Sequence, residues 1–203
     1  MTKLGLFPLP LVLLPSEHVP LHIFEERYKD LIGECLADDS EFGLVYADEA
    51  GIREVGTRAA VLEVLSRFED GRMNIVIEGR ERFRLLDLTS GRSFQTGDVT
   101  PFDDADDPAE PETVLRAEEL FDRLRELTSS DVDVPEADTR QLSYVLAGRV
   151  ELTADVKLEL LAETSERVRL ERVCELLEEA TVTVERQRRA AERAATNGKV
   201  DLG

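Results

Sequence analysis

Halfway along this chain the spacing of the hydrophobic residues changes, and this change limits the possible folds more than any other feature. Between residues 42 and 102, apolar side chains recur at about every second position, as on strands with one buried face. Beyond residue 112 they recur at every third or fourth position, as on helices with one buried face. Residues 103–112 separate the patterns and hold six acidic residues, two prolines and no basic residue. The sequence therefore predicts an α+β protein in two parts, residues 1–102 and 113–203, joined by a solvated acidic linker over 103–112.

The first part is predicted to be a twisted, mostly antiparallel sheet or small barrel with one helix. A proline-containing apolar stretch comes first, and a helical pattern follows over residues 23–36. Asp70 and Gly71 lie between two alternating runs and both tolerate positive φ, which predicts a hairpin. Alternation predicts that the two strands of this hairpin bury the following side chains: Ala60, Leu62, Val64 and Phe68 on one, and Met73, Ile75 and Ile77 on the other. A phase shift between Phe83 and Leu88 predicts a bulge.

The second part is predicted to be a helical bundle. One-sided apolar stripes predict helices at residues 120–127, 142–150, 153–161 and 165–184. Thr153 is expected to cap the third helix, and Thr164 or Ser165 the fourth. The last helix is expected to continue as a polar extension that ends at Asn197 and Gly198.

Charge and composition exclude several classes of function. The chain carries 44 acidic and 25 basic residues, so its net charge of −19 repels phosphate backbones and argues against general nucleic-acid binding. No apolar run is long enough to span a membrane, and the prolines near the start argue against a secretory signal. The two cysteines are far apart within helical patterns and are predicted to be buried thiols, as in a cytoplasmic protein.

Several motifs occur in an order that is typical of one family. The chain reads LGLFPLPLVLLP from Leu4 and PLHIFEERYKDLI from Pro20. Further on it reads GTRAAVLEV from Gly56, IVIEGRERF from Ile75 and LTADVKLELLAETSERV from Leu152. Together these motifs resemble the substrate-recognising amino-terminal domain of Lon-type proteases over about residues 4–184. The resemblance implies a β-rich, PUA-like pseudobarrel followed by a helical bundle.

The resemblance also implies a function in recognition. A member of this family is expected to bind unfolded or tagged polypeptides, or segments with exposed apolar residues, or to dock on an ATP-dependent protease or chaperone. The 203 residues leave no room for ATPase and protease domains, and no Gly-x-x-x-x-Gly-Lys-Ser/Thr motif is present. We therefore expect a stand-alone, non-catalytic, cytoplasmic protein without a cofactor.

The stretch most like the family motif runs from Phe24 to Tyr28. Aromatic residues at helical spacing are usually buried, so packing is the first interpretation of these two rings. In the functional interpretation, a peptide groove is lined by three aromatic residues: Phe24, Tyr28 and Phe83. Three polar residues are expected to fix the helix and barrel in place: Glu25, Arg27 and Arg82.

Other candidate sites are weaker. His18 and His22 have the spacing of zinc ligands on a helix, but Pro20 interrupts such a helix, so no metal site is predicted. Cys35 lies on the apolar stripe of its helix, where a thiol stays protonated and inert.

Two alternative functions are consistent with the sequence. Alternating Arg80, Arg82 and Arg84 could contact nucleic acid through the PUA-like part, although surface ion pairs with the many carboxylates are expected instead. The barrel, or a cleft between the two parts, could hold a small ligand.

Overall fold

The computed structural model describes residues 2–130 and 141–197. It divides into two compact units, the first comprising Met1–Asp106 with Ala147–Thr164 and the second comprising Asp107–Leu146 with Ser165–Gly203. The α+β class predicted from the sequence is confirmed. The division differs from the expected one because residues 147–164 return to the first unit, whereas the sequence pattern assigned every residue after 112 to the helical part.

A pseudobarrel forms the first unit. Its elements are β1 (Thr2–Leu9), β2 (His18–Ile23), α1 (Glu26–Asp38), β3 (Phe42–Asp48), β4 (Gly51–Arg67), β5 (Met73–Thr89), β6 (Thr96–Pro101) and α4 (Ala154–Ala162). The strand order is β2-β5-β4-β3-β1-β6, and β6 pairs with β5 again, which closes the barrel. Closure is possible because β5 is long: its first half pairs with β2 and its second half with β6. β1 and β3 are parallel, and the other pairs are antiparallel.

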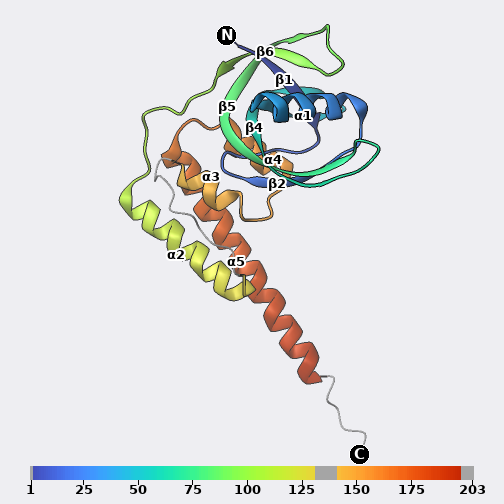
Figure 1. Ribbon diagram of the computed structural model, residues 1–203. Coiled ribbons are helices and arrows are strands. Elements are labelled where there is room, and N and C mark those ends of the chain that lie inside the picture. The colour runs from blue at the N-terminus through green and yellow to red at the C-terminus, as the bar shows by residue number, and fades with distance from the viewer. Residues whose placement is uncertain (1, 131–140, 198–203) are drawn as a thin grey trace, which may run out of the picture. The chain divides into compact units, whose positions relative to one another are not determined.

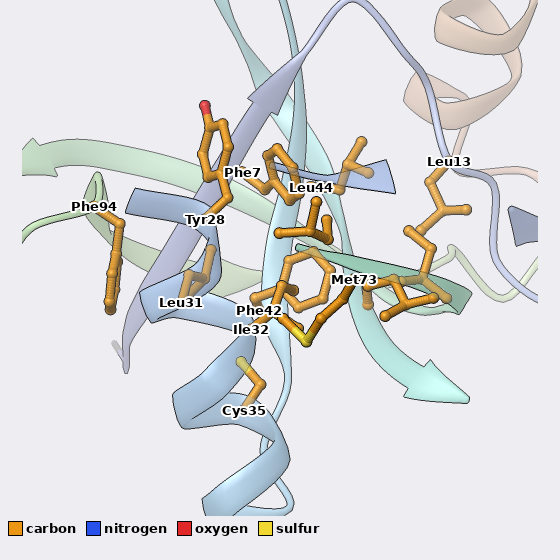
Figure 2. Packing of buried hydrophobic residues seen from close by; sticks show 14 residues of the cluster. Phe7, Leu13, Tyr28, Leu31, Ile32, Cys35, Phe42, Leu44, Met73 and Phe94 are labelled. Atoms are coloured by element: carbon orange, nitrogen blue, oxygen red, sulfur yellow. The ribbon is translucent and has the colours of Figure 1, made fainter. Parts of the chain in front are cut away.

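A large apolar cluster of the first unit lies between α1 and the strands (Figures 1 and 2). The buried residues of α1 are Tyr28, Leu31, Ile32 and Cys35, at the helical spacing seen in the sequence. They meet the inward residues of the β4–β5 hairpin, where Met73, Ile75 and Ile77 are buried as predicted. Figure 2 shows the Tyr28 ring beside Phe7, and the two ring centroids are 3.9 Å apart.

A second apolar cluster fills the barrel around Phe83, whose side chain is completely buried. The other buried residues of this cluster are Leu4, Leu6, Val45 and Val99. Two glycines make room for the Phe83 ring. A Cβ atom added to Gly43 or to Gly56 would come within 2.7 Å of Phe83 Cζ. The two glycines therefore allow the backbones of β3 and β4 to approach a large aromatic side chain.

Bulges in β4 reverse part of the predicted alternation. The register with β5 shifts between Val61 and Glu63 and again between Val64 and Ser66, so two residues of β4 face one of β5. Each extra residue changes the face of the residues that follow. The prediction that Leu62 and Phe68 are buried is therefore wrong, because their exposed fractions are 52% and 42%. The bulge expected in β5 is confirmed by a register shift between Leu85 and Asp87.

Helices dominate the second unit: α2 (Pro111–Thr128), α3 (Leu142–Ala147, whose last residue belongs to the first unit) and α5 (Glu166–Asn197). α2 and α5 lie side by side and run in the same direction, with ion pairs from Arg116 to Glu178 and from Arg123 to Glu185 (Figure 1). As predicted, Thr153 caps α4 and Ser165 caps the start of α5, each accepting a backbone N–H with its hydroxyl oxygen. None of the helices within residues 2–130 and 141–197 has the length and apolarity needed to cross a bilayer.

The acidic linker is more fixed than its composition indicates. Residues 103–110 have no helix or strand, and α2 begins at Pro111, so the last two residues of the expected linker are helical. The Asp104 carboxylate binds Arg82 within the first unit. Asp107 accepts a hydrogen bond from Ser165 Oγ at 2.6 Å and pairs with Arg167 within the second unit, and these bonds lower the pKa of the Asp107 carboxyl. The linker is thus attached to both units by its acidic side chains.

Candidate functional site

The outer face of β2, β5 and β4 carries two aligned rows of side chains. In one row, His22 lies opposite Asn74, and Asn74 lies opposite Ser66. His22 Nδ1 is 2.6 Å from Asn74 Oδ1, and Asn74 Nδ2 donates to Ser66 Oγ at 2.9 Å. These contacts show that the three side chains share one face, as directly opposed residues do. In the next row, Val76 lies between Pro20 and Glu63.

Large apolar side chains border these rows. Leu62 and Leu65 are the extra residues of the two β4 bulges, while Phe24 directly follows β2 and Phe68 directly follows β4. Their exposed fractions are 52% for Leu62, 54% for Leu65, 59% for Phe24 and 42% for Phe68. Val61, directly before Leu62, and Val64, directly before Leu65, both pack inward on the core. This leaves the two bulged leucines on the outer side. We call these four residues the outer apolar face.

His22 joins the two phenylalanines of this face. Its ring centroid is 5.9 Å from that of Phe24 in a stacked arrangement and 6.3 Å from that of Phe68 in an edge-on arrangement. The Arg72 guanidinium lies 5.2 Å from the centre of the Phe68 ring. The aromatic end of the face is therefore ordered by ring contacts even though both phenylalanines are exposed.

Chemically, this surface offers apolar side chains beside a polar row of His22, Asn74 and Ser66. Single exposed hydrophobic residues are normal, but a group of them on adjacent strands is typical of a surface that binds a partner. A flexible apolar segment can bury its side chains against such a surface without a deep pocket. The outer apolar face is therefore the candidate functional site of the first unit.

The structure separates the aromatic residues proposed for a peptide groove. Phe24 belongs to the outer apolar face. Phe83 is completely buried in the barrel, and Tyr28 is 4% exposed beneath α1. Burial raises the pKa of the Tyr28 hydroxyl, which is the expected effect for a phenol held against the core. In this structure neither Tyr28 nor Phe83 offers its ring to a peptide.

The three polar candidates have different surroundings. Glu25 precedes α1 and pairs with Arg27 at 2.8 Å, and the Arg27 guanidinium lies over the Tyr28 ring. Arg82 donates to the carbonyl oxygens of Leu161 and Glu163 at the end of α4, at 2.6 and 2.8 Å. It also binds Asp104. Arg82 thus attaches α4 and the linker to the barrel.

The arginines of β5 do not form an exposed cationic ridge. Arg80 pairs with Glu78 at 2.8 Å, and Arg84 lies 3.7 Å from Glu54. Arg82 is 5% exposed, so the expectation of a surface ion pair is wrong at this position. Its burial follows from its backbone partners on α4, which no local sequence pattern indicates.

The histidines and cysteines show no catalytic grouping. His18 and His22 lie on strand β2, and His18 Nε2 is 3.7 Å from Glu78. Within the described residues, no group of three His, Cys, Asp or Glu side chains could hold a metal ion. Burial raises the pKa of the Cys35 thiol and of the Cys174 thiol, which keeps both protonated.

A hollow of about 330 Å³ lies beside the end of α1. Its lining is mostly polar and charged and includes Asp39, Glu41, Arg80 and Glu81. Glu41 lies 3.7 Å from Arg58. Apolar and aromatic lining is typical of small-ligand sites, so this hollow provides little support for a ligand sensor.

Comparison with known families gives the class of this protein. The family model for the ATP-dependent protease La (LON) substrate-binding domain matches residues 3–179. The chain belongs to this family, whose domain is non-catalytic.

Individual relatives agree with this family. The chain is 22% identical over 195 residues to Lon protease 1 of Hydrogenovibrio crunogenus, covering 88% of this chain and 24% of that protein. It is 26% identical over 184 residues to the Lon protease of Rhizobium meliloti, covering 83% of this chain and 23% of that protein. It therefore spans about a quarter of the length of these curated relatives. A solved Lon N-terminal domain protein from Xanthomonas campestris is 28% identical with a TM-score of 0.66, over 85% of this chain and 97% of that one.

Proposed function

We propose that this chain recognises protein substrates by binding unfolded polypeptide segments through the outer apolar face. The observation that carries the proposal is the position of Phe24, Leu62, Leu65 and Phe68 together on the outer side of β2, β4 and β5. The family supports a role in substrate recognition, and the surface supplies the chemistry.

The geometry favours extended, apolar segments. Side chains on one face of a strand recur at every second residue, and an extended peptide that lies along the strand presents alternate side chains at the same interval. The bulged leucines project from a strand whose flanking valines are anchored in the core, so their positions are fixed before binding. Fixed anchors lower the entropic cost of binding.

Delivery to a protease follows from the same proposal. The relatives named above are Lon proteases, so bound segments would be passed to an ATP-dependent protease, either in one chain or as a separate partner. Recognition by apolar contact accepts many sequences, as a general degradation system requires.

Fluorescence anisotropy of a labelled, permanently unfolded polypeptide tests the proposal, with a folded protein of similar size as the negative control. We expect binding of the unfolded chain that changes little as salt rises, because apolar contacts are not screened. Changing Leu62 and Leu65 to Ser should weaken binding by about tenfold or more, since anchor residues typically contribute above 1 kcal/mol each.

The matched control changes two other exposed leucines of the same unit, Leu86 and Leu88, to Ser. These residues are 42% and 50% exposed on β5, outside the outer apolar face. Equal loss of binding in both double variants would contradict the assignment of the site. A steep fall in affinity with salt would instead favour a polyelectrolyte such as nucleic acid.

A further inference from the structure

One face of α5 carries a charge pattern that the recognition function does not use. Counting four, seven and eleven residues in each direction from Val182 gives six charged positions: Glu171, Glu175, Glu178, Arg186, Arg189 and Arg193. At 100° per residue, all six lie within about 40° of Val182 around the helix. All seven residues are exposed. We call them the α5 stripe.

The sign of the charge changes at the centre of the stripe. The three positions before Val182 are glutamates and the three after it are arginines. A two-fold axis through Val182 exchanges positions that are equally far from it, so each glutamate of one copy would come opposite an arginine of the other. A parallel, in-register pair would instead place like charges together.

We propose that two copies of this chain associate antiparallel through the α5 stripe, with Val182 at the two-fold axis. The partner is a second copy because the stripe is complementary to itself only under this operation, which is the condition for an isologous interface. Val182 is 45% exposed and supplies an apolar contact at the centre.

The stripe is available for such a contact. Its glutamates pair within the chain with Arg167, Arg172 and Arg116, yet the three carboxylate side chains remain 50%, 61% and 47% exposed. Exposed pairs of this kind contribute little to stability and exchange partners readily. Figure 1 shows that α5 continues past the end of α2, and Arg189 is 68% exposed in this part. The buried side of α5, including Leu170, Val173 and Leu177, points away from the stripe.

The dimer should be weak and sensitive to salt, because charged contacts dominate it. The net charge of −19 also opposes association of two copies. At about 0.1 M salt the screening length is about 10 Å, so long-range repulsion is reduced while contacts across the stripe persist. About 0.5 M salt should weaken both the long-range repulsion and the charged contacts across the stripe. The loss of the contacts should dominate, so the dimer should become weaker.

Analytical ultracentrifugation of the full chain tests the proposal with two charge-reversed variants. The acidic variant carries Arg186→Glu, Arg189→Glu and Arg193→Glu, and the basic variant carries Glu171→Arg, Glu175→Arg and Glu178→Arg. Each alone should dimerise at least about tenfold more weakly than the wild type, because its stripe repels itself. Mixed in equal amounts, they should form a one-to-one complex at least as tight as the wild-type dimer.

A control variant separates the stripe from net charge. Arg53→Glu, Arg80→Glu and Arg84→Glu change the net charge as much as the acidic variant does, but lie on strands β4 and β5. This control should dimerise like the wild type. The proposal is overturned if the wild type stays monomeric at millimolar concentration, if the control loses dimerisation as the acidic variant does, or if the mixed variants fail to associate.

Cross-linking tests the orientation directly. Glu175→Cys and Arg189→Cys variants, mixed and oxidised, should form a disulfide-linked heterodimer, because these positions lie opposite each other in the antiparallel pair. Glu175→Cys alone should cross-link poorly. Strong cross-linking of Glu175→Cys with itself would show a parallel pair and overturn the proposed orientation.

Discussion

At the scale of single residues, Phe83 and Phe24 show how position decides the role of one residue type. Both lie in motifs that resemble the family pattern, and both are phenylalanines of the first unit. Phe83 is enclosed by the barrel beside Gly43 and Gly56, whereas 59% of Phe24 is exposed on the outer apolar face. One ring therefore supports the fold and the other is free to contact a partner.

This difference gives a matched pair of mutations. Phe83→Ala should lower the free energy of unfolding by about 3–5 kcal/mol, because it leaves a cavity where the barrel cannot collapse. Phe24→Ala should change it by no more than about 0.5 kcal/mol, as is usual for exposed positions. Urea unfolding followed by far-ultraviolet circular dichroism measures both values. Similar costs for the two variants would contradict the placement of Phe83.

The two cysteines make a second prediction at this scale. Burial raises the pKa of each thiol above its ordinary value, so the thiolate fraction at pH 8 is smaller than in an unfolded chain. Both thiols should react with a disulfide reagent at least about tenfold more slowly in native protein than in denaturant, and the native rate should rise as the pH increases. Fast reaction of either thiol at pH 8 would show that it is accessible and ionised.

At the scale of secondary-structure elements, the bulges of β4 determine the candidate site. Val61 and Val64 both pack on the core, which strict alternation does not allow, and the bulges place the extra residues Leu62 and Leu65 on the outer side. The sequence does contain a signal, since Val61-Leu62 and Val64-Leu65 are adjacent apolar pairs that period two cannot bury together. The inward face of β5 and the helix ends at Thr153 and Ser165 were predictable because they depend on local spacing and capping.

The bulged leucines should matter for binding and not for stability. Leu62→Ser with Leu65→Ser should leave the free energy of unfolding within about 1 kcal/mol of the wild type, since both side chains are already in water. Ile75→Ala and Ile77→Ala on the paired strand should each cost about 2–5 kcal/mol. Thermal and urea unfolding of the three variants give the comparison. A large loss of stability in the leucine variant would mean that these side chains pack in the core.

At the scale of the whole molecule, long-range polar contacts decide which segments belong together. Arg82 lies about 80 residues from its α4 partners, and Lys157 binds Glu17 across 140 positions of the sequence. Local periodicity predicts that α4 exists but contains no information about such partners. The sequence pattern therefore groups α4 with the other helices, whereas its contacts group it with the first unit. For the same reason the buried Arg82 was expected on the surface.

Removing the Arg82 guanidinium should release α4 without unfolding the second unit. Arg82→Met keeps much of the side-chain volume but leaves the Leu161 and Glu163 carbonyls and the Asp104 carboxylate without this partner. Unsatisfied groups of this kind cost about 1–3 kcal/mol each. Hydrogen exchange should then show faster exchange of α4 amides, with α2 and α5 unchanged. Faster exchange in α5 as well would show that the two units open together.

The most direct test of the proposed function is nuclear magnetic resonance mapping of the bound surface. A ¹⁵N-labelled chain is titrated with the permanently unfolded polypeptide, and amide shifts are followed residue by residue. We predict that the shifts concentrate at Phe24, at residues 62–68 and at the neighbouring amides of β2 and β5. Shifts confined to other surfaces, or no shifts at concentrations where binding is measured, would contradict the outer apolar face as the site of recognition.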